Sequence, residues 1–415
     1  MKKGLLAISI LLVSGLYAQK LTLKQSIDKA LLNHPDIKSF MLKVELSQKS
    51  YDSSFSAYLP QVNLQANYNP LQTFALPVNG LFRTVDDDSF GVGVSVRQKI
   101  WDFSKTSSTI KASKVDEDIS KLSLEDAKEL LAYRVKSLYS LMILQQEAIR
   151  VRKKDLQTKE AFYNQAKALV QQGIKTKADE SRFLSSVYVA QDALALATSL
   201  YEKAKTSLSL YIDEKIEDDI ELEKEVLKRS YSSDIDIEKE ILQTNYQLKI
   251  DSLNIKKNRL LHKATKASNY GSIDAIASYN HIDTLNSYDS KLVGINLNIP
   301  LYSGGKISAQ TQKAKISLQL AQAKKASKLL TLKEDIEKLL IDIKRYDQTI
   351  KAREAQLDAA NETKKVLDAR YKEGLATYIE VLDVASVALN AELGVVEAYY
   401  QKSMAIDQIE YLKGR

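Results

Sequence analysis

The side chains that most often carry out chemistry are few and scattered in this sequence. Its three histidines, His34, His262 and His281, have no spacing typical of a metal site, and cysteine is absent. Gly91-Val92-Gly93 is not followed by the lysine and hydroxyl residue of a phosphate-binding loop. The sequence therefore predicts no catalytic centre, no metal site and no cofactor.

One acidic pair is better placed to act electrostatically. Glu380 and Asp383 are three residues apart, so on a helix they share one face. Such a pair ordinarily belongs to a solvated helix face. If a symmetric assembly repeated it around a narrow opening, the carboxylates would form two rings that attract cations.

Very long helices must position this pair. Only 13 glycines and 5 prolines occur in 415 residues, and none of them lies between about Ser104 and Gln172 or between Lys306 and Glu373. A helix of that length would measure on the order of 100 Å. Apolar residues recur every seven positions in both stretches, a pattern typical of coiled coils; they are Val135, Met142, Ile149, Leu156, Tyr163 and Val170, and Leu329, Ile336, Ile343, Ile350 and Leu357.

Each long stretch ends at a single glycine, Gly173 or Gly374, and a further apolar-patterned stretch follows at about 175–212 and 375–412. Glycine ends helices readily because it adopts positive φ. Each half of the chain is therefore predicted to form an antiparallel helical hairpin whose tip lies at that glycine.

Four shorter segments alternate apolar and polar residues and are predicted to be strands, at about 60–68, 90–99, 272–280 and 291–299. Loops are expected at about 69–89 and 280–290. The alternation fits a half-buried soluble sheet, and it also fits a membrane barrel with lipid on one side and a wet lumen on the other. Since four strands cannot close a barrel, the second interpretation requires several copies of the chain.

The two halves repeat each other. Val92 and Val293, Val135 and Ile336, and Gly173 and Gly374 are all separated by 201 positions. We therefore predict a signal peptide at 1–18, a first repeat at 19–212 and a second repeat at 213–412. The fold class is mainly α with a small β part, in which coiled-coil hairpins build an α-barrel and four strands enter a shared transmembrane β-barrel.

The first eighteen residues have the pattern of a secretory signal: Lys2 and Lys3 precede an apolar run that ends near Ala18. The formal charge of +7 is a small excess among 60 basic and 53 acidic residues. Export and the small excess together argue against a nucleic-acid-binding function.

From about residue 20 to 412 the chain resembles the TolC family of outer-membrane ducts. The resemblance rests on four segments in the family's order: Leu21–Pro35, Ala57–Pro60, Asn298–Lys306 and Arg370–Asp383. It implies a homotrimer in the outer membrane, extending into the periplasm, with twelve strands in one barrel and a belt of mixed structure formed by about 212–240 and the C-terminal end. The duct would serve efflux or type I secretion, together with a periplasmic adaptor and an inner-membrane pump.

The resemblance also implies roles for single residues. Glu380 and Asp383 match acidic positions of the tunnel entrance, and Asp179 and Tyr371 match polar contacts that keep the entrance closed. The arginine expected two residues after Gly374 is replaced by Ala376, for which Lys175 or Lys177 is a candidate substitute. The adaptor-docking tips would comprise Gly173, Gly374, Leu375 and Thr377.

Two other classes of protein remain as alternatives. A periplasmic coiled-coil scaffold or adaptor would share the signal and the heptads, but it would not need alternating strands in both halves. An exported hydrolase would need converging polar residues, which the sequence does not indicate. Drugs, metal ions and proteins all remain open as cargo.

Overall fold

A computed structural model describes residues 20–218, 220–231 and 236–414. The predicted signal peptide at 1–18 lies outside these residues. The chain divides into two compact units, of which unit 1 comprises Met1–Ile37, Lys128–Glu240 and Asp335–Arg415, and unit 2 comprises Lys38–Ala127 and Ile241–Glu334.

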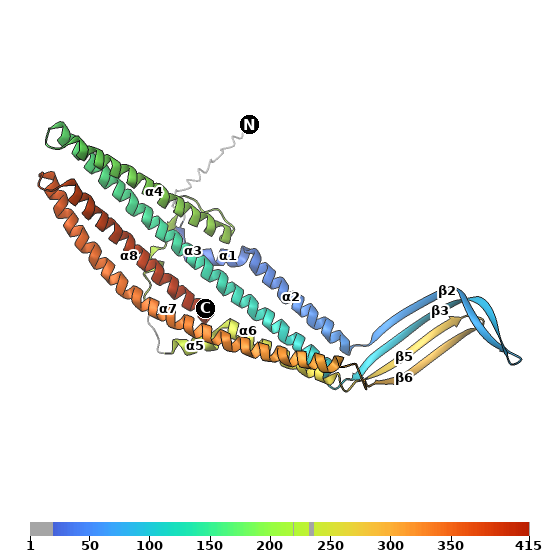
Figure 1. Cartoon of the computed structure of the whole chain (residues 1–415). Coiled ribbons are helices and arrows are strands. Elements are labelled where there is room, and N and C mark those ends of the chain that lie inside the picture. The colour runs from blue at the N-terminus through green and yellow to red at the C-terminus, as the bar shows by residue number, and fades with distance from the viewer. Residues whose placement is uncertain (1–19, 219, 232–235, 415) are drawn as a thin grey trace, which may run out of the picture. The chain divides into compact units, whose positions relative to one another are not determined.

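The predicted mainly helical fold with a small β part is confirmed (Figure 1). The first hairpin consists of α3 (Lys105–Gln171) and α4 (Lys177–Ile212), and the second of α7 (Lys306–Lys372) and α8 (Tyr378–Lys413). The long arms both have 67 residues and the short arms both have 36, so the hairpin itself is the duplicated element. Heptad residues such as Val135, Met142 and Ile336 are fully buried.

Shorter elements complete the two units. Unit 1 contains α1 (Leu23–Asn33) and a parallel pair of two-residue strands, β1 (Lys20–Leu21) and β4 (Glu221–Leu222). The buried Tyr139 hydroxyl donates to the Leu21 carbonyl (2.7 Å) and accepts from the Glu223 amide (2.8 Å) on either side of this pair. Helices α2 (Pro35–Phe55) and α6 (Tyr246–Ala267) lie mainly or wholly in unit 2, and α5 (Ile237–Thr244) precedes α6.

Unit 2 also holds an antiparallel sheet in the order β2-β3-β5-β6. The strands are β2 (Gln61–Val78), β3 (Leu81–Trp101), β5 (Ser272–Asp283) and β6 (Ser287–Asn298). Paired residues share a face, and we call the side that carries Val62, Leu64, Val94 and Ile295 the apolar face of the sheet. The other side, with Asn63, Gln65, Gly93 and Asn280, is its polar face.

The prediction of a loop at 69–89 is wrong. Strands β2 and β3 continue through most of it and meet at Asn79-Gly80, where both residues have positive φ, as a tight two-residue hairpin turn requires. The loop expected at 280–290 likewise shrinks, because β5 reaches Asp283 and β6 begins at Ser287. Pro70 and a register shift between Asn69 and Gln72 interrupt the alternation, so the pattern conceals the continuing strand.

Candidate functional site at the helical tips

The two hairpin tips have the same backbone geometry. Gly173 and Gly374 have φ of 74° and 75°, and their amides bond to the carbonyls of Val170 and Tyr371, both at 3.0 Å. The amides of the next residues, Ile174 and Leu375, bond to the carbonyls one residue earlier, Leu169 and Arg370, as in the usual glycine-terminated helix end. A side chain at either position would meet open space but would strain the backbone.

Both second arms begin with the same cap. Thr176 accepts from the Asp179 amide through its side chain, and Asp179 Oδ2 accepts from the Thr176 amide at 3.1 Å and hydroxyl at 2.9 Å. Glu380 Oε2 accepts in the same way from the Thr377 amide at 2.7 Å and hydroxyl at 2.8 Å. These reciprocal bonds form a capping box, which satisfies amides that a helix otherwise leaves unpaired.

The cap changes the interpretation of the predicted acidic pair. Glu380 is exposed and its pKa lies below the ordinary value, chiefly because its carboxylate accepts the Thr377 amide. Asp383 is exposed about one turn later on α8. Glu380 thus holds a fixed negative charge in the first turn of α8, and the pair lies on the surface, where nothing within the described chain covers it.

An aromatic cluster joins the two hairpins near these tips. We call Phe162, Ala166, Phe183, Tyr371, Ala376 and Val381 the tip cluster; all six are buried. The Phe183 ring lies 5.9 Å from Phe162 of its own hairpin and 5.7 Å from Tyr371 of the other, between centroids. The Tyr378 ring packs against the Phe183 ring in a T-shaped arrangement, with the two centroids 6.2 Å apart. The link between the hairpins at their tips is therefore mainly apolar.

The two predicted gate residues, Asp179 and Tyr371, lie in different hairpins. No hydrogen bond joins them in the described structure, where the Asp179 carboxylate accepts from Thr176 in its cap. The Tyr371 hydroxyl is buried without a hydrogen-bond partner there. Burial raises the pKa of Tyr371, and the nearby charge of Asp179 raises it further.

The tip cluster also accounts for Ala376. Its methyl group is buried in the cluster, where an arginine would have to bring a charge among aromatic rings. Lys175, one of the two candidate substitutes, places its ammonium 5.6 Å above the centre of the Tyr371 ring. Lys177, the other candidate, pairs instead with Glu180 at 2.7 Å.

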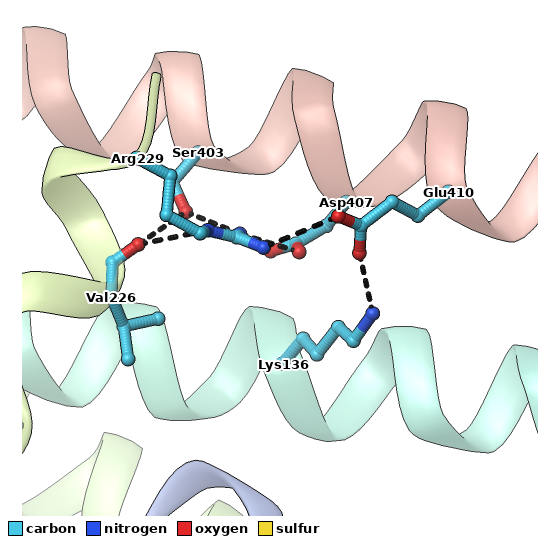
Figure 2. A network of polar contacts seen from close by, with 6 residues as sticks. All are labelled: Lys136, Val226, Arg229, Ser403, Asp407 and Glu410. Carbon is cyan, nitrogen blue, oxygen red and sulfur yellow. Dashed lines mark hydrogen bonds and ion pairs between the residues drawn. The ribbon is translucent and has the colours of Figure 1, made fainter. Parts of the chain in front are cut away.

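A second polar arrangement lies in unit 1 at the far end of α8. We call Lys136, Arg229, Ser403, Asp407 and Glu410 the polar clamp (Figure 2). Arg229 donates to Asp407 Oδ1 at 2.6 Å, to Ser403 Oγ at 3.0 Å and to the Val226 carbonyl at 3.1 Å. Lys136 of α3 pairs with Glu410 at 2.6 Å. The clamp thus fastens α8 both to α3 and to the segment after β4.

Asp407 is the most deeply placed charge of the clamp. It is 1% exposed, and its Oδ2 atom has no hydrogen-bond partner in the described structure. Burial raises the pKa of Asp407 above its ordinary value, and Arg229 opposes that rise. The carboxylate therefore depends on Arg229 for its charge compensation.

The capping boxes, the tip cluster and the polar clamp were not predicted from the sequence, although the sequence carries a local signal for the capping boxes. Thr176-Lys177-Ala178-Asp179 and Thr377-Tyr378-Ile379-Glu380 both have the spacing of a capping box. The tip cluster and the polar clamp join residues from different helices, some more than 170 positions apart along the chain. No local pattern indicates such pairs.

Comparisons with known proteins bear on the whole chain. A family model described as "Outer membrane efflux protein" matches residues 26–212 and 238–415. The outer membrane efflux protein BepC of Brucella suis biovar 1 (strain 1330) is 22% identical over 425 residues, covering 97% of this chain and 88% of BepC.

Solved structures show the same fold. A membrane protein from Pseudomonas aeruginosa superposes with a TM-score of 0.83 at 18% identity, covering 96% of this chain and 91% of that one. The outer membrane protein VceC of Vibrio cholerae also gives 0.83, at 14% identity, with 94% and 96% covered. At such identities the likeness shows the fold alone.

Proposed function

This chain belongs to the outer membrane efflux protein family, and from that premise we propose that three copies form one continuous duct across the outer membrane and into the periplasm. The family consists of efflux channels rather than enzymes, so the chain is an outer-membrane component of an efflux system. The trimer, the docking partners and the entrance residues are the parts that we propose.

The observation that carries the proposal is the open sheet. In the order β2-β3-β5-β6, the outer edges of β2 and β6 have no strand beside them in the described chain. Leu64 and Val293 on the apolar face are 72% and 87% exposed, as expected for a surface against lipid. Within a bilayer each unpaired backbone group costs several kcal/mol, so the edges must meet strands of further copies.

The size of the barrel favours three copies over two. Two copies would supply eight strands, and a barrel of about eight strands has an interior that its own side chains fill. Three copies would supply twelve, which leaves a lumen for cargo. A passage therefore requires the larger assembly.

The surface of α4 supports assembly along the hairpins as well. An 18-residue window of this helix has a mean hydropathy of 1.2 and is apolar enough, by length and composition, to cross a membrane, yet only 22% of it is buried. Val189 and Leu196 are 63% and 61% exposed. Because α4 is already one arm of a coiled-coil hairpin, we assign this surface to a hairpin of the neighbouring copy.

The helical tips are the proposed docking point for a periplasmic adaptor, through which an inner-membrane pump would deliver cargo. Leu375 beside Gly374 is 68% exposed, and Gly173 occupies the same place in the first hairpin. Thr377 contributes by capping α8, which fixes the direction of the tip. Efflux and type I secretion both fit this arrangement.

The assembly can be tested directly on outer membranes. We expect the particle solubilised in mild detergent to have the mass of three chains, since only then do twelve strands close the barrel. The purified particle should conduct ions in a planar bilayer. A particle of two chains, or a chain released from membranes by an alkaline wash, would overturn the proposal, and the second result would favour the periplasmic scaffold.

The entrance rings give a separate prediction. Replacing Glu380 by glutamine and Asp383 by asparagine in one variant should lower the preference for cations over anions by about tenfold, because fixed charges at a narrow opening concentrate counter-ions. The reversal potential in a salt gradient measures this preference. Glu397→Gln is a matched control, since Glu397 is exposed on α8 about 20 Å beyond Asp383. An unchanged reversal potential in the double variant would contradict the rings.

A further inference from the structure

The β2–β3 hairpin runs on beyond the rest of the sheet. Toward the hairpin turn, the pairing of β3 with β5 ends at Phe90, which lies opposite Asp283. Strands β2 and β3 stay paired with each other beyond this point, as far as Val78 and Leu81 (Figure 1). We call the two-stranded part formed by Gln72–Val78 and Leu81–Asp87 the distal ribbon. It has no third strand on either side in the described chain.

The polarity of the two faces is reversed in the distal ribbon. Along β3 the even positions Val92 and Val94 lie on the apolar face, but the same side continues into Asp88, Asp86 and Thr84. The polar face, which holds Gly93 and Gly91, continues into Val85 and Leu81. Their partners across the ribbon are also apolar: Phe74 lies opposite Val85, and Val78 lies opposite Leu81. Five apolar side chains thus gather on this side: Phe74, Leu76, Val78, Leu81 and Val85. The exceptions to the reversed pattern are Gln72, Asp87 and Arg83 on this side, and Ala75, Pro77 and Phe82 on the other.

A fixed structural feature marks the point of reversal. Strand β2 has one extra residue between Asn69 and Gln72, so its residues change face there relative to β3. The buried Ser89 hydroxyl accepts from Asn69 Nδ2 at 2.9 Å and donates to Gln72 Oε1 at 2.6 Å, across the bulge. The reversal is therefore built into a hydrogen-bonded bulge.

The reversed polarity identifies what the ribbon faces. A ribbon that stayed in lipid would keep the sheet's polarity, and one surrounded entirely by water would not gather five apolar side chains on one face. An apolar surface on the lumen side needs a partner above the lumen. In a symmetric duct, that place is shared by the same ribbons of the other copies.

We propose that the distal ribbons of three copies meet through Phe74, Val78 and Leu81 and close the external mouth of the duct. This inference rests on the proposed trimer. A twelve-stranded barrel has a radius of roughly 12 Å from its strand spacing and tilt, and a ribbon of seven residues reaches about 23 Å. Each ribbon is thus long enough to reach the threefold axis.

Paired cysteine variants test this contact. The chain contains no cysteine, so Leu81→Cys and Phe82→Cys each introduce a single thiol. The two side chains are 77% and 80% exposed in one chain but lie on opposite faces of the ribbon. In outer membranes we expect L81C to form a chain-to-chain disulfide on mild oxidation, and to react with a bulky maleimide about tenfold more slowly than F82C, because burial shields it.

Particle mass, measured on the same membranes, separates the two proposals. If the particle contains three chains but L81C reacts as fast as F82C and forms no chain-to-chain disulfide, the ribbon contact is overturned and the duct stands. Cross-linking of L81C to a different protein, or shielding that disappears when lipopolysaccharide is removed, also overturns it by identifying another occupant. If the mass is not that of three chains, both proposals fail.

Discussion

Replacing Phe183 by alanine is expected to weaken the tip cluster by about 3–5 kcal/mol, the usual cost of removing a fully buried phenylalanine. Phe183 is 0% exposed and is the ring that contacts Phe162, Tyr371 and Tyr378 together. Its loss therefore removes the apolar link between the two hairpins as well as volume from one of them.

Hydrogen exchange at the tips measures this effect. Amides in the last turn of α3 and the first turns of α4 and α8 should exchange on the order of a hundredfold faster, because local opening becomes easier. Phe183→Leu is the matched control, since it keeps most of the apolar volume and should change exchange much less. The cluster would not be the link between hairpins if α4 alone were affected and α8 kept its protection.

Loosening the tips should also affect the entrance of the proposed duct. The contact that joins the hairpins at their tips is apolar, and the carboxylates of Asp179 and Glu380 beside it are held in their own caps. We therefore expect the conductance of F183A to exceed that of the unaltered duct, whereas a change of salt alone should leave the cluster intact. Apolar packing, unlike surface ion pairing, is not screened by salt.

The elements that depend on periodic patterns could be predicted from the sequence. The heptads and Gly173 and Gly374 indicate the hairpins, because coiled-coil packing and positive φ leave local signatures. The 201-residue offset predicts that both hairpins have the same build. This is observed, as Thr176 and Thr377 cap the second arms identically.

The predictions that failed concern residues whose structure depends on exceptions to a pattern or on contacts distant in the sequence. The sequence predicts a loop where the distal ribbon lies, because the alternation of β2 breaks at Pro70, and the structure places a bulge there between Asn69 and Gln72. The Asn79-Gly80 turn was a local signal for a longer hairpin. At the tip, Ala376 looks like a missing polar partner in the sequence, and only the surrounding rings show that it belongs to an apolar contact.

Replacing Arg229 by alanine is the second change for which we expect a large effect. It would leave the Asp407 carboxylate buried without its closest cation, and breaking a buried ion pair in this way costs about 3–5 kcal/mol. Because the polar clamp holds the end of α8, the loss should appear as a lower melting temperature of the helical signal. Exchange should also be faster at residues 400–412.

The pH dependence separates loss of charge compensation from loss of packing. Burial holds the pKa of Asp407 above its ordinary value, so the folded state takes up a proton more readily than the unfolded chain. The stabilising effect of that proton is complete below the unfolded pKa of about 3.9 and is lost as the pH rises through the higher folded pKa. Removing Arg229 raises the folded pKa further, so R229A should differ least from the unaltered protein at low pH and most near neutrality.

A double variant completes the argument for the polar clamp. Asp407→Leu together with Arg229→Met replaces the buried ion pair by apolar groups, a change that is often neutral or stabilising. The double variant should therefore recover most of the stability that R229A loses. Its melting temperature should also lose the pH dependence that Asp407 causes. If R229A and the double variant were equally unstable at every pH, the loss would come from the packing of the Arg229 side chain against Val226 and Ser403, and charge compensation would not be the role of the clamp.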